Sequence, residues 1–208
     1  MFDFSTLVGY SVIVLGLFLI PGPAVLLVFG RTVEGGRKVG IATGLGIAVG
    51  DLIHTLFAAV GLSALLMTSS LAFSLVKLVG AAYLIYLGVR AFMAKSNGTA
   101  LPKTTRVAPT RAFLEAIPAE VLNPKTALFF LAFLPQFVHP ENGSNLMQFM
   151  VLGLIFVVLS SVYTTLLALA VKPLGRMLKS LSRFSRWQGK VVGIIFVSLG
   201  LKVATQQS

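Results

Sequence analysis

Cysteine is absent from this chain of 208 residues, and histidine occurs only twice. The absence of cysteine excludes disulfide bonds and thiol chemistry. Two histidines are too few for a multi-histidine metal centre. Charged residues make up only 11% of the chain and hydrophobic residues 56%, with a mean hydropathy of +0.93. A soluble domain of this length needs more surface charge than this composition supplies, so we expect a polytopic membrane protein.

Other familiar signals are also missing. The first residues, Met1-Phe-Asp3-Phe-Ser-Thr, contain no lysine or arginine, and no small-residue cleavage site follows the apolar run after them. This pattern predicts a first membrane span and not a signal peptide. The chain shows no nucleophile–base pair and no motif such as His-Glu-x-x-His. We therefore predict that the protein is not an enzyme and uses no cofactor.

Six apolar runs are present, each near the length of about 20 residues that a membrane-spanning helix needs. They cover residues 7–29, 39–62, 71–92, 112–138, 147–171 and 189–204. A polar stretch with two prolines, residues 94–111, divides them into two groups of three. We expect a three-helix repeat at 1–93, a cytoplasmic linker at 94–111 and a second three-helix repeat at 112–208, together in one membrane domain.

The odd number of helices in each group has a topological consequence. Equivalent helices of the two groups would cross the membrane in opposite directions, as in inverted-topology repeats. The first run contains Pro21 and Pro23, and the fourth contains Pro124, at matching places in the two groups. Proline lacks an N–H and clashes with the preceding turn, so it interrupts a helix. The predicted fold is an all-α polytopic membrane protein with six transmembrane helices in two inverted repeats, the first and fourth helices interrupted.

The formal net charge of +11 is distributed by loop. The connections after the first, third and fifth runs are rich in lysine and arginine, and those after the second and fourth contain neither. The positive-inside rule then places the basic loops in the cytoplasm and both termini outside. The charge therefore indicates contact with anionic lipid, and we predict no nucleic-acid binding.

Polar groups lie at membrane depth near both proline interruptions. With a rise of about 1.5 Å per residue, the Pro21-Gly22-Pro23 motif lies about 20 Å from the outer end of its run, and Asn123-Pro124 lies about 16 Å into the fourth. The half-helices that begin behind these breaks present free amide groups that suit an anionic group such as a carboxylate. Lys125 would add a full positive charge there. The alternative is that the prolines only kink their helices.

Two acidic residues extend this candidate site. Asp51 lies about 18 Å from the inner end of the second run, and His54 shares its helix face at i+3. An acid and an imidazole within the membrane are candidates for a proton relay. The alternatives are a buried ion pair or a hydrogen bond to the backbone. Glu120 lies one turn before Asn123, so both could face the same cavity as Asp51.

Several segments resemble one protein family. They are Pro21-Gly22-Pro23, the glycine-rich run that ends at Gly50-Asp51, residues 77–88, and the run from Asn123-Pro124-Lys125 to Phe137. These segments are similar to the lysine-exporter superfamily, in its homoserine/threonine-efflux (RhtB-type) branch. The resemblance implies a compact exporter of the bacterial inner membrane, driven by the proton gradient, for amino acids or their derivatives. Glu120 stands where the family is expected to carry an uncharged polar residue, which leaves the substrate class open.

Two function hypotheses follow. The first is a secondary active exporter of amino acids or related small zwitterions by proton antiport, with a homodimer possible from the packing glycines and small size. Lys125 and the half-helix amides would hold the carboxylate of the substrate, while Asp51 and Glu120 would hold the amine or carry the proton. The second is a cation or metal-ion exporter or channel, with the two acids as oxygen ligands. Lys125 beside them disfavours a metal site, because a fixed cation repels another, so we predict none.

Overall fold

The computed structural model describes residues 2–69 and 107–174, together with single positions between 71 and 93 and at 194 and 197. Most of the predicted third span, of the predicted sixth span and of the 94–111 linker lies outside the described residues. So does most of the 77–88 segment.

The described regular structure is all helical, and two of its helices are long and apolar enough to cross a membrane. The first is α3 (Arg37–Phe57), which continues through a π-helical stretch (Ala58–Leu62) into α4 (Ser63–Thr68). The second is α8 (Asn145–Leu174). They correspond to the predicted second and fifth runs, 39–62 and 147–171, although the first of these helices extends to Thr68.

Two further pairs of helices are each bent at a short break. Helices α1 (Phe4–Leu19) and α2 (Pro23–Gly35) meet at 58°. Helix α6 (Pro109–Val121) meets the segment Pro124–Phe137, which begins with α7 (Pro124–Ala132), at 50°. Two short 3₁₀ turns follow α7, at Leu134–Phe137 and Pro140–Asn142. If each bent pair is one span, the described residues contain up to four candidate membrane spans.

Local chemistry explains where these helices begin and end. Both α2 and α7 have proline at their first position, where the missing N–H needs no partner. Asp3 caps α1 by accepting a hydrogen bond from the Thr6 amide at 2.9 Å, and its bonds to Thr6 and Ser5 lower the pKa of Asp3. Gly36 joins α2 to α3 with φ of 83°, a left-handed conformation that favours glycine.

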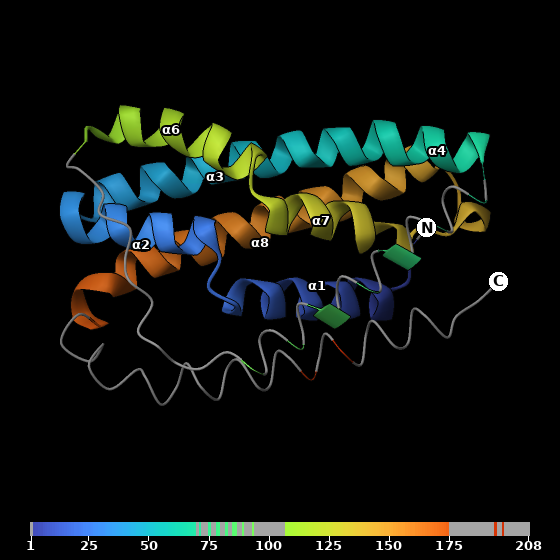
Figure 1. Cartoon of the computed structure of the whole chain (residues 1–208), viewed down its shortest axis with the longest axis horizontal. Helices are drawn as coiled ribbons and strands as arrows, with labels where there is room; N and C mark the ends of the chain where they lie inside the picture. Colours follow the sequence, from blue (N-terminus) through green and yellow to red (C-terminus); the bar gives the residue numbers. More distant parts are fainter. Residues whose placement is uncertain are drawn as a thin grey trace.

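Helix α3 lies at the centre of the bundle, with α6 on one side and α8 on another (Figure 1). Helices α3 and α6 begin at the same end of the bundle, and α8 ends there. Glycines allow the close approach. A Cβ on Gly50 would lie 2.6 Å from Cβ of Glu120 in α6, and one on Gly44 would lie 2.7 Å from Oγ1 of Thr164 in α8.

Aromatic side chains fill the space between α1, α7 and α8. We call this group the aromatic cluster: Tyr10, Phe18, Phe129, Phe130, Phe133, Phe137 and Phe156. Phe156 is central, because its ring lies edge-on to Phe18 at 5.1 Å and to Phe130 at 4.9 Å between centroids. Such pairs add about 0.5–1.5 kcal/mol each to the burial of their surface.

Candidate functional site

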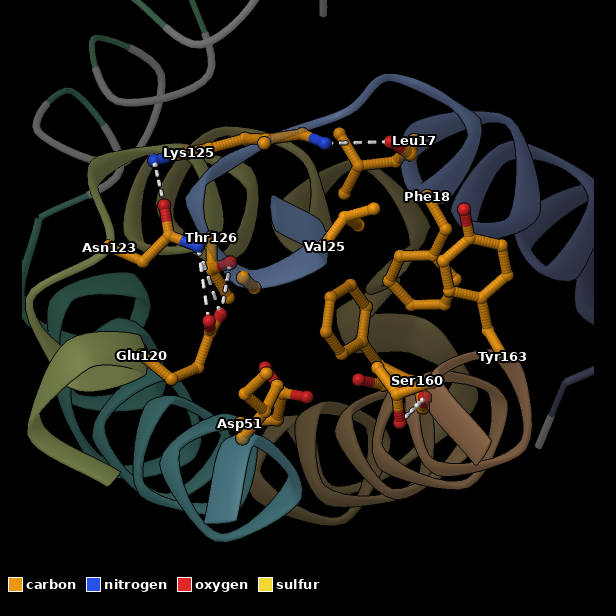
Figure 2. A pocket seen from close by; sticks show the side chains of 15 residues that line it. Leu17, Phe18, Val25, Asp51, Glu120, Asn123, Lys125, Thr126, Ser160 and Tyr163 are labelled. Carbon is orange, nitrogen blue, oxygen red and sulfur yellow. Dashed lines mark hydrogen bonds between the residues drawn. The ribbon is translucent and has the colours of Figure 1, made fainter. Parts of the chain in front are cut away.

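A small cavity lies where the two helix breaks face α3 and α8 (Figure 2). Its volume is about 30 Å³, which is room for about one or two water molecules. The polar side chains around it are Asp51, Glu120, Asn123, Lys125, Thr126, Ser160, Tyr163 and Thr164. Apolar side chains, among them Val25, Ile47 and Phe156, form the rest of the wall. The cavity is therefore lined by both polar and apolar side chains.

Two buried carboxyl groups are the central feature of this cavity. Asp51 of α3 is 1% exposed and Glu120 of α6 is 2% exposed, and the two carboxyl groups are neighbours. Figure 2 shows both side chains pointing into the cavity. Ser160 of α8 lies beside Asp51. The Oδ2 atom of Asp51 has no hydrogen-bond partner among the described residues, so it can bind an incoming donor.

The carboxyl group of Glu120 is held by two side chains from beyond the α6–α7 break. The Nδ2 atom of Asn123 lies 3.3 and 3.1 Å from its two oxygens, and the Thr126 hydroxyl donates to Oε1 at 2.5 Å. Asn123 also caps α7, because its Oδ1 accepts from the amide of Lys125 at 3.1 Å. One asparagine thus starts a helix and orients an acid.

Lys125 connects the two helix breaks. Its Nζ donates to the carbonyl oxygens of Leu17 at 2.8 Å and Ile20 at 2.7 Å, at the C-terminal end of α1. A cation suits that end, where the helix dipole is negative. The ammonium group is thus bonded to backbone carbonyls in this structure. Its predicted role as a ligand for the carboxylate of a substrate stays a prediction.

His54 is not among the residues that line the cavity. Its Nε2 lies 3.1 Å from the carbonyl oxygen of Glu120, and its ring lies 5.7 Å from that of Phe130, nearly parallel to it. Because a carbonyl oxygen accepts, Nε2 carries a hydrogen here. This contact is the backbone hydrogen bond that the sequence left as an alternative. A part for His54 in proton transfer stays a prediction.

Apart from His54, the site residues predicted from the sequence divide into two groups. Gly22, Asp51, Glu120, Asn123 and Lys125 line the cavity. The three prolines, at 21, 23 and 124, set the helix ends and are not among its lining residues.

Sequence reasoning missed several lining residues. Thr126, Ser160 and Thr164 are polar and buried, and Phe156 forms part of the apolar wall. The spacing of Ser160 and Thr164, one turn apart on one face of a largely apolar run, was a usable signal. Thr126 follows Lys125 directly and had no signal of its own. The described part of the chain contains no group of three or more His, Cys, Asp or Glu side chains that could hold a metal ion.

Polar groups gathered at helix breaks inside an apolar helical bundle are typical of membrane transport proteins. Comparison of the sequence with known protein families also indicates a transport protein. The sequence model of the family described as LysE type translocator matches residues 15–207. The chain belongs to this family, which is a family of transporters and not of enzymes.

Individual relatives align over nearly the whole chain. An uncharacterized membrane protein of Bacillus subtilis, YrhP, is 33% identical, and the alignment covers 95% of this chain and 97% of that protein. An uncharacterized membrane protein of Pseudomonas aeruginosa is 31% identical over 98% of this chain and 95% of its own length. The leucine efflux protein of Salmonella choleraesuis is 28% identical over 96% and 94%. No solved structure matches the chain significantly.

Proposed function

We propose that this protein exports an amino acid or a related small zwitterion across the bacterial inner membrane in exchange for protons. The relative named leucine efflux protein supports an amino acid as the cargo. The observation that carries the proposal is the pair of buried carboxyl groups, Asp51 and Glu120, at one cavity.

The carboxyl pair supplies a coupling mechanism. Two adjacent acids away from water avoid a costly repulsion when they share a proton. The ammonium group of an arriving amino acid provides the opposite charge that lets the pair release that proton. Proton and substrate then compete for Asp51 and Glu120, so binding of one displaces the other. Such competition produces antiport directly.

The size and wall of the cavity add two expectations. A volume of about 30 Å³ is too small for an amino acid, so the arrangement corresponds to a closed state. Opening requires the helix pairs at the breaks to move. The apolar wall, which includes Val25, Ile47 and Phe156, suits an aliphatic side chain on the substrate.

The proposal includes an architecture for the whole chain. Six spans form two inverted repeats, with interrupted first and fourth helices, and access alternates as one repeat rocks against the other. The bends of 58° and 50° at the two breaks support this arrangement. Both termini lie outside, the basic loops contact anionic lipid in the cytoplasmic leaflet, and a homodimer is the proposed assembly.

Transport by purified protein in lipid vesicles tests the mechanism. We expect the wild type to move leucine against its gradient when a pH gradient is imposed. The Asp51→Asn variant should lose this pH-driven transport, because an amide cannot bind and release the proton. Asp3→Asn is the matched control, since Asp3 lies outside the cavity, and should keep it. If Asp51→Asn couples leucine movement to the pH gradient at the wild-type rate, the role of Asp51 is wrong.

The same vesicles test the rival hypothesis of a cation or metal-ion exporter. Movement of divalent or monovalent metal ions driven by the pH gradient, without movement of any amino acid, would replace the amino-acid proposal. We expect no such movement, because Lys125 lies at the same cavity as the two acids and repels a second cation.

A further inference from the structure

The C-terminal end of α1 holds an ammonium group between two carbonyl oxygens. Nζ of Lys125 lies 2.8 Å from the oxygen of Leu17 and 2.7 Å from that of Ile20, at one side of the cavity. Leu17 and Lys125 are separated by 108 positions in the sequence. The contact therefore joins the break between α1 and α2 to the beginning of α7.

The sequence around the break explains why these carbonyls can accept from an outside donor. The last carbonyls of a helix have no partner within it, and the amides that follow the helix usually satisfy them. Here Pro21 and Pro23 follow α1, and proline has no N–H to donate. The oxygen of Leu17 still accepts from the amide of Ile20 at 3.2 Å, so Lys125 is a second donor to it. The motif leaves these oxygens able to accept a further hydrogen bond beside a cavity, at the negative end of a helix dipole.

Gly22 provides the space for the lysine side chain. A Cβ at this position would lie 2.9 Å from Cδ and 3.3 Å from Nζ of Lys125. The φ of Gly22 is −106°, a value that any residue adopts. Glycine therefore gives the lysine side chain room in this arrangement, and the backbone conformation does not require it. The Pro-Gly-Pro motif and Lys125 act as one unit.

We propose that the carbonyl oxygens of Leu17 and Ile20 form a monovalent-cation site, which the ammonium group of Lys125 fills as a tethered ion. In transporters with broken helices, carbonyls at such breaks and helix C-terminal ends coordinate sodium. Here a side chain supplies the charge, so neither folding nor transport needs sodium. Lys125 is a positioning residue that holds the two breaks together. The inference goes beyond the proposed function and holds whichever solute is carried.

The Lys125→Ala variant vacates the site and allows free ions to be tested in it. Purified protein is heated in chloride salts of sodium, potassium, propylammonium or choline at equal ionic strength. Propylammonium replaces the three carbons and the nitrogen that the substitution removes, whereas choline is too bulky. In choline, we expect the midpoint temperature of thermal unfolding to be lower for Lys125→Ala than for wild type. In propylammonium or sodium, the midpoint temperature of the variant should rise by several degrees and reach a plateau as the salt concentration increases. The wild-type midpoint should be the same in all four salts.

Lys125→Met is the matched control, because it fills the side-chain channel without a charge. It should show no response to the choice of salt. The inference is overturned if Lys125→Ala responds to sodium and propylammonium no more than wild type does, or if Lys125→Met responds equally.

A second measurement decides the question if Lys125→Ala does not fold. Leucine exchange by wild-type protein in vesicles is compared in sodium and in choline. Equal rates support the tethered ion, and loss of exchange without sodium overturns it. The melting experiment requires no transport, so its outcome is separate from that of the proposed exporter function.

Discussion

Gly50 of α3 lies directly against Glu120 of α6. A Cβ on Gly50 would come within 2.6 Å of Cβ of Glu120 and within 3.2 Å of the carbonyl oxygen of Ile117. The next residue in α3 is Asp51, whose carboxyl group neighbours that of Glu120. The absence of a side chain at position 50 therefore brings the two acids to one cavity.

The first prediction concerns this contact. Gly50→Ala should separate α3 from α6, since Cβ of Glu120, 2.6 Å from the new Cβ, is attached to the α6 backbone and cannot rotate away. We expect a loss of stability of about 1–3 kcal/mol, typical of overpacking, and a marked fall in leucine exchange. Thermal unfolding and vesicle exchange measure the two effects. Gly61→Ala is the control, because no described atom lies within 4 Å of a Cβ placed there. Equal behaviour of the two variants would contradict the role of Gly50.

The second prediction separates the two functions of Asn123. Its Oδ1 caps α7 and its Nδ2 donates to Glu120. Asn123→Asp keeps an oxygen for the cap but loses the donor and adds a third acid beside Glu120. Asn123→Ala loses both functions.

We expect Asn123→Ala to lose about 1 kcal/mol from the missing cap, in addition to the lost bonds to Glu120. Asn123→Asp should be destabilised at neutral pH and recover as the pH falls, because protonation removes the added charge. Thermal melts of both variants from pH 5 to pH 8 measure this. The interpretation fails if the two variants show the same pH dependence.

The third prediction concerns the ion pair between α2 and α6. Nη2 of Arg31 lies 2.6 Å from Oε2 of Glu115, and Nε of Arg111 lies 2.7 Å from Oε1 of the same residue. The side chain of Arg31 is 12% exposed and that of Arg111 is 72% exposed. Because water screens exposed pairs, which contribute about 0.2–1 kcal/mol, Arg111→Gln should change stability little. Arg31→Gln should cost more, since it leaves Glu115 without its less exposed partner. Thermal unfolding of both variants tests this order, and a larger effect of Arg111→Gln would reverse it.

Much of the helical layout is determined by local sequence. Hydrophobic runs located the long helices at Arg37–Thr68 and Asn145–Leu174, since a membrane helix must satisfy its backbone internally and present apolar side chains. Helices α2 and α7 begin at Pro23 and Pro124, because proline has no N–H to continue a preceding helix. The acids Asp51 and Glu120 were identified as candidates because charge is costly at membrane depth.

Tertiary structure alone decided which groups meet. Sequence offered no signal that Lys125 would reach the carbonyl oxygens of Leu17 and Ile20. It left a backbone hydrogen bond of His54 open as an alternative, but did not indicate that the partner would be the carbonyl of Glu120. Ser160 entered the site only through the packing of α8 on α3. The physical reason is the separation in sequence of the interacting residues. The formation and the ends of a helix depend on residues a few positions away, whereas these contacts depend on how helices distant in sequence are aligned. Glycines such as Gly50 permit that alignment, but only the packed bundle shows which partner each one meets.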